Sequence, residues 1–261
     1  MTWIRRSSRG KGARPLPQLR VTSHGAVTEI LIGDGDRHNV LGIREWAALE
    51  RTFRNLAASA DVRVVVLTGT GSTFCAGFDL HEWQGAPPRA VDAAFAQMEA
   101  ACTAVEDLPV PVVAKVRGVA AGAGCQLALA CDLRVLSRSA RIGMPIARLG
   151  ILASPSFAAR LSLLAGADIA RELLYTGRLI HGTEAARVGL ATRCVTGSRL
   201  DRATVSIAES IIRQPPAAIS AAKRAVAVGL GPAIEAARRA AGGPSTDHGS
   251  FSAGVAAFLR S

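Results

Sequence analysis

Aromatic residues are scarce in this chain: they make up 4% of its 261 residues, with a single tyrosine. Proteins that bind single-stranded nucleic acid stack the bases on aromatic side chains. The net charge of +11 would attract a polyanion to the basic face of the protein. Because no stacking motif accompanies that charge, nucleic-acid binding is the least favoured of the functions considered.

The sequence also lacks long apolar runs and a recognisable cysteine motif. Glycine, arginine, aspartate or proline interrupts every apolar stretch before eighteen residues, so we expect no membrane span. The five cysteines are odd in number, and their spacing fits no zinc ribbon. We therefore expect no metal site, and we interpret the chain as a reduced, cytoplasmic protein.

Acidic residues are absent from the first twenty positions, "MTWIRRSSRGKGARPLPQLR". This segment lacks the apolar core of a secretory signal and a clear amphipathic run. We interpret residues 1–19 as a basic, disordered extension. The whole chain is 49% hydrophobic and 20% charged, a composition that suits a globular protein with a sizeable core.

Strand and helix patterns alternate along most of the chain. Residues 19–35 predict a hairpin that turns at Gly33–Gly35. Buried strands are predicted in 61–71, 109–118 and 133–137, and helical patterns in 43–60, 90–108, 124–132, 167–177 and 181–189. From residue 201 the pattern is wholly helical, with a flexible break at 242–250. The alternation predicts an α/β protein with parallel strands.

Two segments repeat one design. A buried strand is followed by "TGSTFCAGFDL" (70–80), and the next by "VAAGAGCQLAL" (119–129). Small residues let a ligand approach the backbone, and unpaired N–H groups at a helix start favour negative charge. Two such groups aimed at one oxygen would form an oxyanion hole. A dinucleotide site is excluded because the glycine spacing is wrong and no acidic strand end follows.

These segments, with "RHNVL", "RIGMPIARLGI" and "ELLYTGRLIHGTEAARVGLATRCV", resemble the crotonase superfamily, the enoyl-CoA hydratase/isomerase family, from about Val21 onward. The resemblance implies a crotonase-like spiral of ββα repeats over residues 20–200. It also implies a C-terminal helical trimerisation region over 201–261, with trimers often paired into hexamers. The implied substrate is an acyl-CoA thioester. No cofactor is expected, since coenzyme A enters as part of the substrate.

The resemblance also implies which residues contact that substrate. The N–H groups of Phe78 and Ala123 would hold the thioester oxygen as an enolate forms, with Ala76 and Gly122 lining the same turns. Arg37 would contact a CoA phosphate. Ala123 stands where the family usually has glycine, which carries a steric cost only if its φ is positive.

The chain departs from the family at its two catalytic glutamates, whose positions hold Gln126 and Ile146. An amide cannot titrate and an isoleucine cannot hydrogen-bond, so water addition by the usual pair is doubtful. Glu99 lies where some members carry a catalytic histidine, on a helix side shared with Phe95, Met98 and Cys102. It is either a relocated base or a solvated helix residue.

Two functions therefore stay open. One is an acyl-CoA enzyme that uses the oxyanion hole with non-standard acid–base groups, for isomerisation, decarboxylation, thioester hydrolysis or C–C cleavage. The other is a non-catalytic CoA-thioester binder, and a buried Glu99 facing the thioester would favour the enzyme. For the remaining candidates a structural role is favoured over a catalytic one. These are Ser154 as a helix cap, Asp79, Glu82 and Asp132 as structural acids, His81 as a surface residue, and Arg148 as a surface residue or substrate contact.

Overall fold

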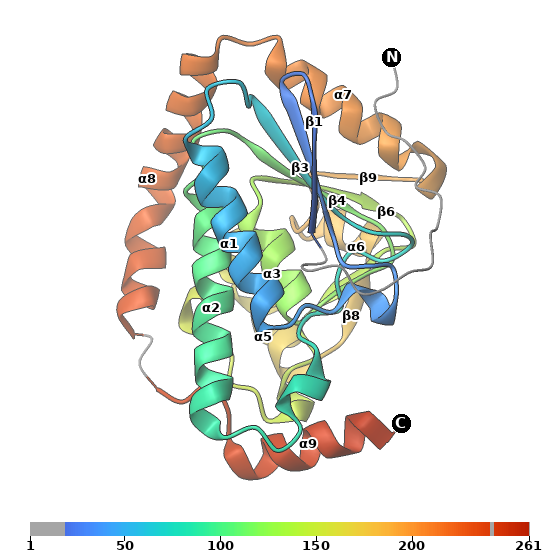
Figure 1. Cartoon of the computed structure of the whole chain (residues 1–261), viewed down its shortest axis with the longest axis vertical. Coiled ribbons are helices and arrows are strands. Elements are labelled where there is room, and N and C mark those ends of the chain that lie inside the picture. Colours follow the sequence, from blue (N-terminus) through green and yellow to red (C-terminus); the bar gives the residue numbers. More distant parts are fainter. Residues whose placement is uncertain (1–18, 241–242, 261) are drawn as a thin grey trace.

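A computed structural model gives the fold and describes residues 19–240 and 243–260 (Figure 1). The main sheet has the strand order β1-β2-β3-β4-β6-β9, and only the β1–β2 pair is antiparallel. Its strands are β1 (Leu19–His24), β2 (Val27–Ile32), β3 (Val64–Gly69), β4 (Val112–Val116), β6 (Leu133–Ser137) and β9 (Arg193–Val195). The smaller sheet joins β5 (Val119–Ala121), β7 (Arg141–Gly143) and β8 (Leu179–His181).

The chain forms a spiral. Each turn of the spiral contains a strand of the main sheet, then a strand of the smaller sheet or a single bridge, and then a helix. The helices of these turns are α1 (Ile43–Ala57), α2 (Pro88–Glu106), α3 (Ala123–Ala130), α4 (Pro155–Ala165), α5 (Ala167–Thr176) and α6 (Gly182–Arg187). Single bridges, Leu41 to Phe78 and Cys75 to Ala120, take the place of a second strand in the early turns. The predicted ββα spiral is confirmed.

The core forms because the central strands are apolar on both faces. The valines of β3 and β4 are fully buried, as expected for parallel strands covered on both sides. In Figure 1, α1 and α2 lie side by side across one face of the main sheet. On the other face, α7 (Leu200–Ile212) packs Leu200 and Ile207 against strand valines.

The predicted N-terminal hairpin is present, but the position of its turn was wrong. The chain reverses after His24, at Gly25, whose φ of +62° is left-handed. Gly33 instead follows the second strand. β1 begins at Leu19, one residue inside the predicted extension, and the remainder of that extension lies outside the described residues.

Short 3-10 helices complete the connections: η1 (Arg37–Asn39), η2 (Leu80–Trp83), η3 (Ala147–Leu149) and η4 (Gly197–Arg199). The last helix, α9 (His248–Arg260), lies across the end of the molecule nearest the start of α2 (Figure 1). It packs against η3 and η2 and buries Phe251 and Val255. The C-terminal helix therefore closes one end of the spiral.

α8 (Pro216–Ala240) buries none of its residues, although it contacts α4. By length and composition alone it could cross a membrane, although the sequence predicted no membrane span. Lys223 and Arg238 tie it to the body through ion pairs with Asp132 and Glu106, at 2.8 and 3.0 Å. Its exposed apolar side chains include Val226, Val228 and Leu230.

Candidate active site

The two glycine-rich turns meet at distances that only glycine allows. A Cβ added to Gly77, whose φ is +106°, would lie 3.0 Å from the Ala121 carbonyl oxygen and 3.2 Å from the Ala123 nitrogen. A Cβ added to Gly124 would lie 2.1 Å from the Cys75 carbonyl oxygen. The sequence prediction placed the turns in one site, and the structure brings them into contact.

The backbone N–H groups of Phe78 and Ala123 are available to a ligand. Neither donates to any acceptor among the described residues, and both residues line the same cavity. Ala123 is the first residue of α3, so its N–H lies at the positive end of the helix dipole. The left-handed conformation falls on Gly122 (φ +56°), so Ala123 is unstrained.

Ala76 and Gly122 also line the cavity, but their N–H groups are engaged. Ala76 donates to the His38 carbonyl oxygen at 3.0 Å, and Gly122 donates to the Gly143 carbonyl oxygen at 3.1 Å. The two turns therefore offer the cavity the N–H groups of Phe78 and Ala123, and these are the two that the family resemblance selects.

A cluster of three polar side chains faces the same cavity, which has a volume of about 1030 Å³. Ser154 Oγ donates to Glu99 Oε1 at 2.6 Å, and Gln126 Nε2 donates to the same oxygen. Glu99 is half-buried on α2, and Gln126 is buried on α3. Ser154 caps α4 by accepting a bond from the Phe157 N–H at 3.2 Å, so it acts as a cap and also as a partner of Glu99.

Apolar side chains form much of the remaining wall. Ile146 is buried there, and the Phe78 ring lies 4.5 Å from that of Trp83 and 5.3 Å from that of Phe95, centroid to centroid. α9 contributes Phe258 to the lining. Nothing in the sequence pattern pointed to this helix as part of the site, because its contribution depends on how the chain end folds back.

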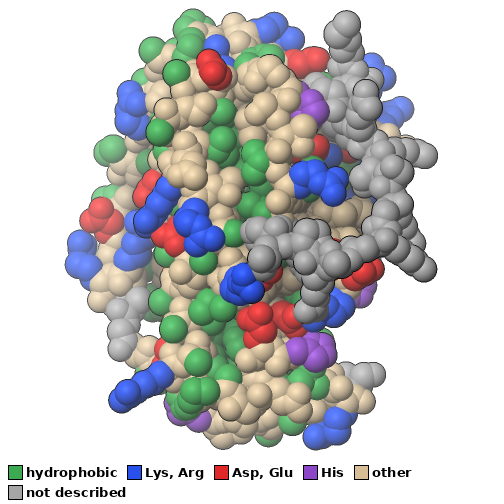
Figure 2. Space-filling view, in the orientation of Figure 1, with side chains coloured by type: hydrophobic (Ala, Val, Ile, Leu, Met, Phe, Trp, Pro, Cys, Tyr) green, Lys and Arg blue, Asp and Glu red, His purple; other side chains and the backbone are tan. Residues whose placement is uncertain are grey.

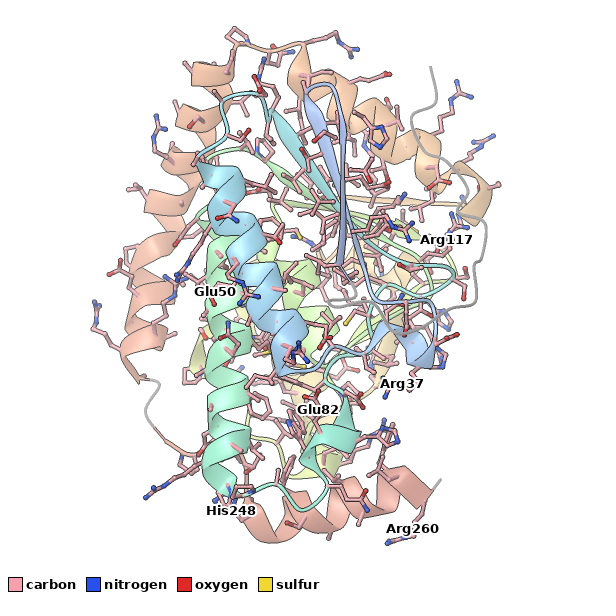
Figure 3. The ribbon with its side chains drawn as sticks, viewed as in Figure 1. Arg37, Glu50, Glu82, Arg117, His248 and Arg260 are labelled. Carbon is pink, nitrogen blue, oxygen red and sulfur yellow. The ribbon has the colours of Figure 1, made fainter. Side chains whose placement is uncertain are left out.

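Charged residues surround Asp79, beside the first turn. Arg37 Nη1 lies 2.6 Å from Asp79 Oδ2, and His81 Nδ1 lies 3.0 Å from Oδ1. Partial burial alone would raise the pKa of Asp79, but the bonds from His81 and Arg37 outweigh it and lower that pKa. Figure 2 shows acidic, basic and histidine side chains gathered on this face of the molecule, in the area where Figure 3 labels Arg37 and Glu82.

Arg37 is held in place by an unusual backbone. Arg37, His38 and Asn39 have φ values of 43°, 57° and 56°, a left-handed conformation that non-glycine residues rarely adopt. The buried Asn39 side chain holds this turn: it accepts from the Gly35 N–H at 2.8 Å and donates to the Thr73 carbonyl oxygen at 2.7 Å. The turn places Arg37 and His38 in the cavity lining.

Cys75 lies in the first turn but is not a nucleophile. Complete burial raises the pKa of its thiol to about 12, despite the opposing hydrogen bond from the Gly77 N–H. The thiol is therefore protonated at neutral pH. Among the described residues, no group of three or more His, Cys, Asp or Glu side chains is arranged to hold a metal ion.

Comparison with known proteins places this geometry in a family. The family model described as enoyl-CoA hydratase/isomerase matches residues 22–258. The chain belongs to the enoyl-CoA hydratase/isomerase family. It is 34% identical to carnitinyl-CoA dehydratase of Proteus mirabilis over 78% of each chain. It is 31% identical to probable enoyl-CoA hydratase 2, mitochondrial, of Arabidopsis thaliana, over 80% of this chain and 69% of that one.

Solved structures of the enoyl-CoA hydratase/isomerase family share the fold. The crystal structure of an enoyl-CoA hydratase from Mycobacterium smegmatis has a TM-score of 0.79 and 32% identity, covering 94% of this chain and 96% of that one. One from Bacillus anthracis has a TM-score of 0.77 and 32% identity, covering 86% and 91%. The crotonase-like spiral that the sequence resemblance implies is thus confirmed.

Proposed function

We propose that this enoyl-CoA hydratase/isomerase family member acts on an acyl-CoA thioester through an enolate, with Glu99 as its base. The observation that carries the proposal is that the N–H groups of Phe78 and Ala123, which have no acceptor among the described residues, share a single cavity with the carboxylate of Glu99. The donors stabilise developing negative charge, and the carboxylate accepts a proton.

The two N–H groups act on the thioester carbonyl. When its oxygen lies between the N–H groups of Phe78 and Ala123, both donate hydrogen bonds that strengthen as negative charge develops on it. The engaged N–H groups of Ala76 and Gly122 do not take part, although both residues line the cavity. Arg37 and the overall positive charge favour the CoA phosphates.

The proton transfer balances with one carboxylate. Glu99 takes a proton from the carbon next to the thioester carbonyl. The C–H electron pair forms a carbon–carbon double bond, and the carbonyl π electrons move to oxygen. When the proton on the Glu99 carboxyl is replaced by a deuteron from heavy water, delivery of that deuteron to the same carbon gives exchange. Return of the proton to the far carbon of a β,γ-unsaturated chain gives isomerisation, with no water added.

Hydration by two glutamates is a poorer fit to this chain. The relatives include proteins named as hydratases and a dehydratase. The two glutamate positions implied by the family resemblance hold Gln126 and Ile146 here, and both line the cavity. Since neither can exchange a proton with water, we propose enolate chemistry that one base can complete.

Deuterium exchange tests the proposal. The protein is incubated in heavy water with saturated, unsaturated and malonyl-type acyl-CoAs, and exchange and product mass are followed. Glu99→Gln is expected to slow exchange by roughly 10²–10⁴-fold. Glu50→Gln is the matched control, because Glu50 also bonds a glutamine, Gln97, but lies outside the cavity lining (Figure 3). Tight acyl-CoA binding without exchange or product would instead support a non-catalytic binder.

The family resemblance and the composition lead to further proposals. The trimer or hexamer implied by the family resemblance is supported by the exposed apolar residues of α8, and sedimentation of the purified protein measures it. The division at residue 200, the cytoplasmic location and the lack of a resident cofactor stay predictions from the sequence.

A further inference from the structure

We propose that Gln126 and Ser154 are positioning residues that fix the carboxylate of Glu99, so that one oxygen is held and the other serves as the base. This inference rests on the proposed enolate function and adds two residues to it. It also gives a reason for glutamine at position 126.

Both donors bond the same carboxylate oxygen. Ser154 Oγ lies 2.6 Å from Glu99 Oε1, and Gln126 Nε2 bonds that oxygen as well. Among the described residues, none donates to Oε2. A carboxylate held by two donors on one oxygen has its orientation fixed, while its second oxygen stays free to accept a proton.

The donors come from separate elements, so the arrangement is set by packing. Glu99 lies on α2, Gln126 on α3 and Ser154 at the first turn of α4. Gln126 is 2% exposed, and its backbone N–H belongs to α3, which starts in the second glycine turn. Helix α3 therefore supplies the Ala123 N–H to the thioester oxygen. It also supplies Gln126, which together with Ser154 forms the clamp that holds Glu99.

An amide at position 126 fits this role better than a carboxylate would. A glutamate there would face Glu99 with a second negative charge, and two adjacent carboxylates retain a proton between them. Glu99 also interacts electrostatically with Cys102 of α2, whose burial raises its pKa, and with Arg160 of α4, which pairs with Glu106. Gln126 can donate to Glu99 without adding charge.

The test compares two variants of Ser154 by deuterium exchange into butyryl-CoA. Ser154→Gly removes the hydroxyl but keeps most of the helix cap, since glycine is tolerated at helix N-caps much better than alanine. We expect it to lower the maximal exchange rate roughly 10–100-fold with an unchanged KM. Ser154→Thr retains a hydroxyl and is expected to restore most of the rate. Equal rates for wild type and Ser154→Gly, or no recovery in Ser154→Thr, would overturn the clamp.

Gln126→Glu supplies a readout that a purely structural role would not move. We expect the acidic limb of its pH–rate profile to move to higher pH by roughly one unit or more, because the two carboxylates share a proton. An acidic limb that coincides with that of wild type would contradict the proposal.

The failures of the two proposals differ. A wild-type protein that shows no exchange, or a Glu99→Gln variant that exchanges normally, removes the proposed function and the clamp together. Exchange that depends on Glu99 but not on Ser154 or Gln126 removes the clamp alone.

Discussion

The half of the cavity that would hold the thioester oxygen is made of backbone, whereas the half that would move a proton is made of side chains. The first consists of two N–H groups fixed by glycine contacts between adjacent turns. The second consists of Glu99 and the donors that reach it from α3 and α4. Backbone donors persist when side chains change, so a family can keep its oxyanion hole while its acid–base groups move.

The two halves also tolerate change differently. The space around the glycines of the two turns is bounded by backbone atoms, which cannot easily move to admit a side chain. The Glu99 cluster depends on three side chains, and each can be replaced without moving the main chain. We therefore expect the largest effects from changes to the turns, and smaller ones as changes move outward.

Gly124→Ala is expected to have the largest effect. Its new Cβ would lie 2.1 Å from the Cys75 carbonyl oxygen, so the turns must separate and the two N–H groups no longer point at one oxygen. We expect exchange to fall at least as far as in Glu99→Gln, because both donors, each worth roughly 10²–10³-fold, are lost together. Gly229→Ala is the control, since that helical glycine has nothing within 4 Å of an added Cβ. Normal exchange in Gly124→Ala would contradict the backbone half of the comparison.

Moving the carboxylate from position 99 to positions 126 and 146 tests whether the side chains select the reaction. The triple variant Glu99→Gln, Gln126→Glu, Ile146→Glu leaves the turns intact and places acids at the two positions implied by the family resemblance. We expect it to gain hydration of crotonyl-CoA over Glu99→Gln, by less than the roughly 100-fold that a well-placed acid–base group supplies. A triple variant with Ile146→Gln in place of Ile146→Glu is the control. Equal hydration in both would mean that the side-chain half does not select the reaction.

Asp79→Asn should have the smallest effect, because Asp79 lies at the edge of the first turn. In the folded protein the pKa of Asp79 is lowered from its usual value of 3.8, so its ionised form stabilises the fold above that pH. This stability is lost as the pH falls through the lowered pKa. Denaturant unfolding should therefore show wild type more stable than Asp79→Asn at neutral pH, with the gap closing below pH 3.8. A gap independent of pH would assign the difference to packing.

The sequence predicted the main strands and helices and the two glycine-rich turns of the site. The runs of β-branched residues in β3 and β4 and the helical spacing of α1 and α2 are local signals, and each element formed where it was predicted. The hairpin turn was misplaced because glycine at 25 and glycine at 33 and 35 give the same local signal. Only strand pairing distinguishes them.

The partners of Glu99 lay beyond the reach of sequence patterns. Ser154 was predicted as a cap, which it is, but its bond to Glu99 spans 55 residues of sequence. The left-handed turn at 37–39 gave no local signal either, because it is held by the buried side chain of Asn39. Such contacts depend on how separate helices and loops pack.

The amino-acid sequence alone specified the alternation of strands and helices, the two glycine turns and the absence of glutamate at positions 126 and 146. These follow from local backbone preference and residue chemistry, which neighbouring residues decide. The folded chain was needed to show that the N–H groups of Phe78 and Ala123 share a cavity with Glu99, and that α9 closes one end of the spiral. The physical reason is that side chains far apart in sequence meet only after the helices and turns have packed.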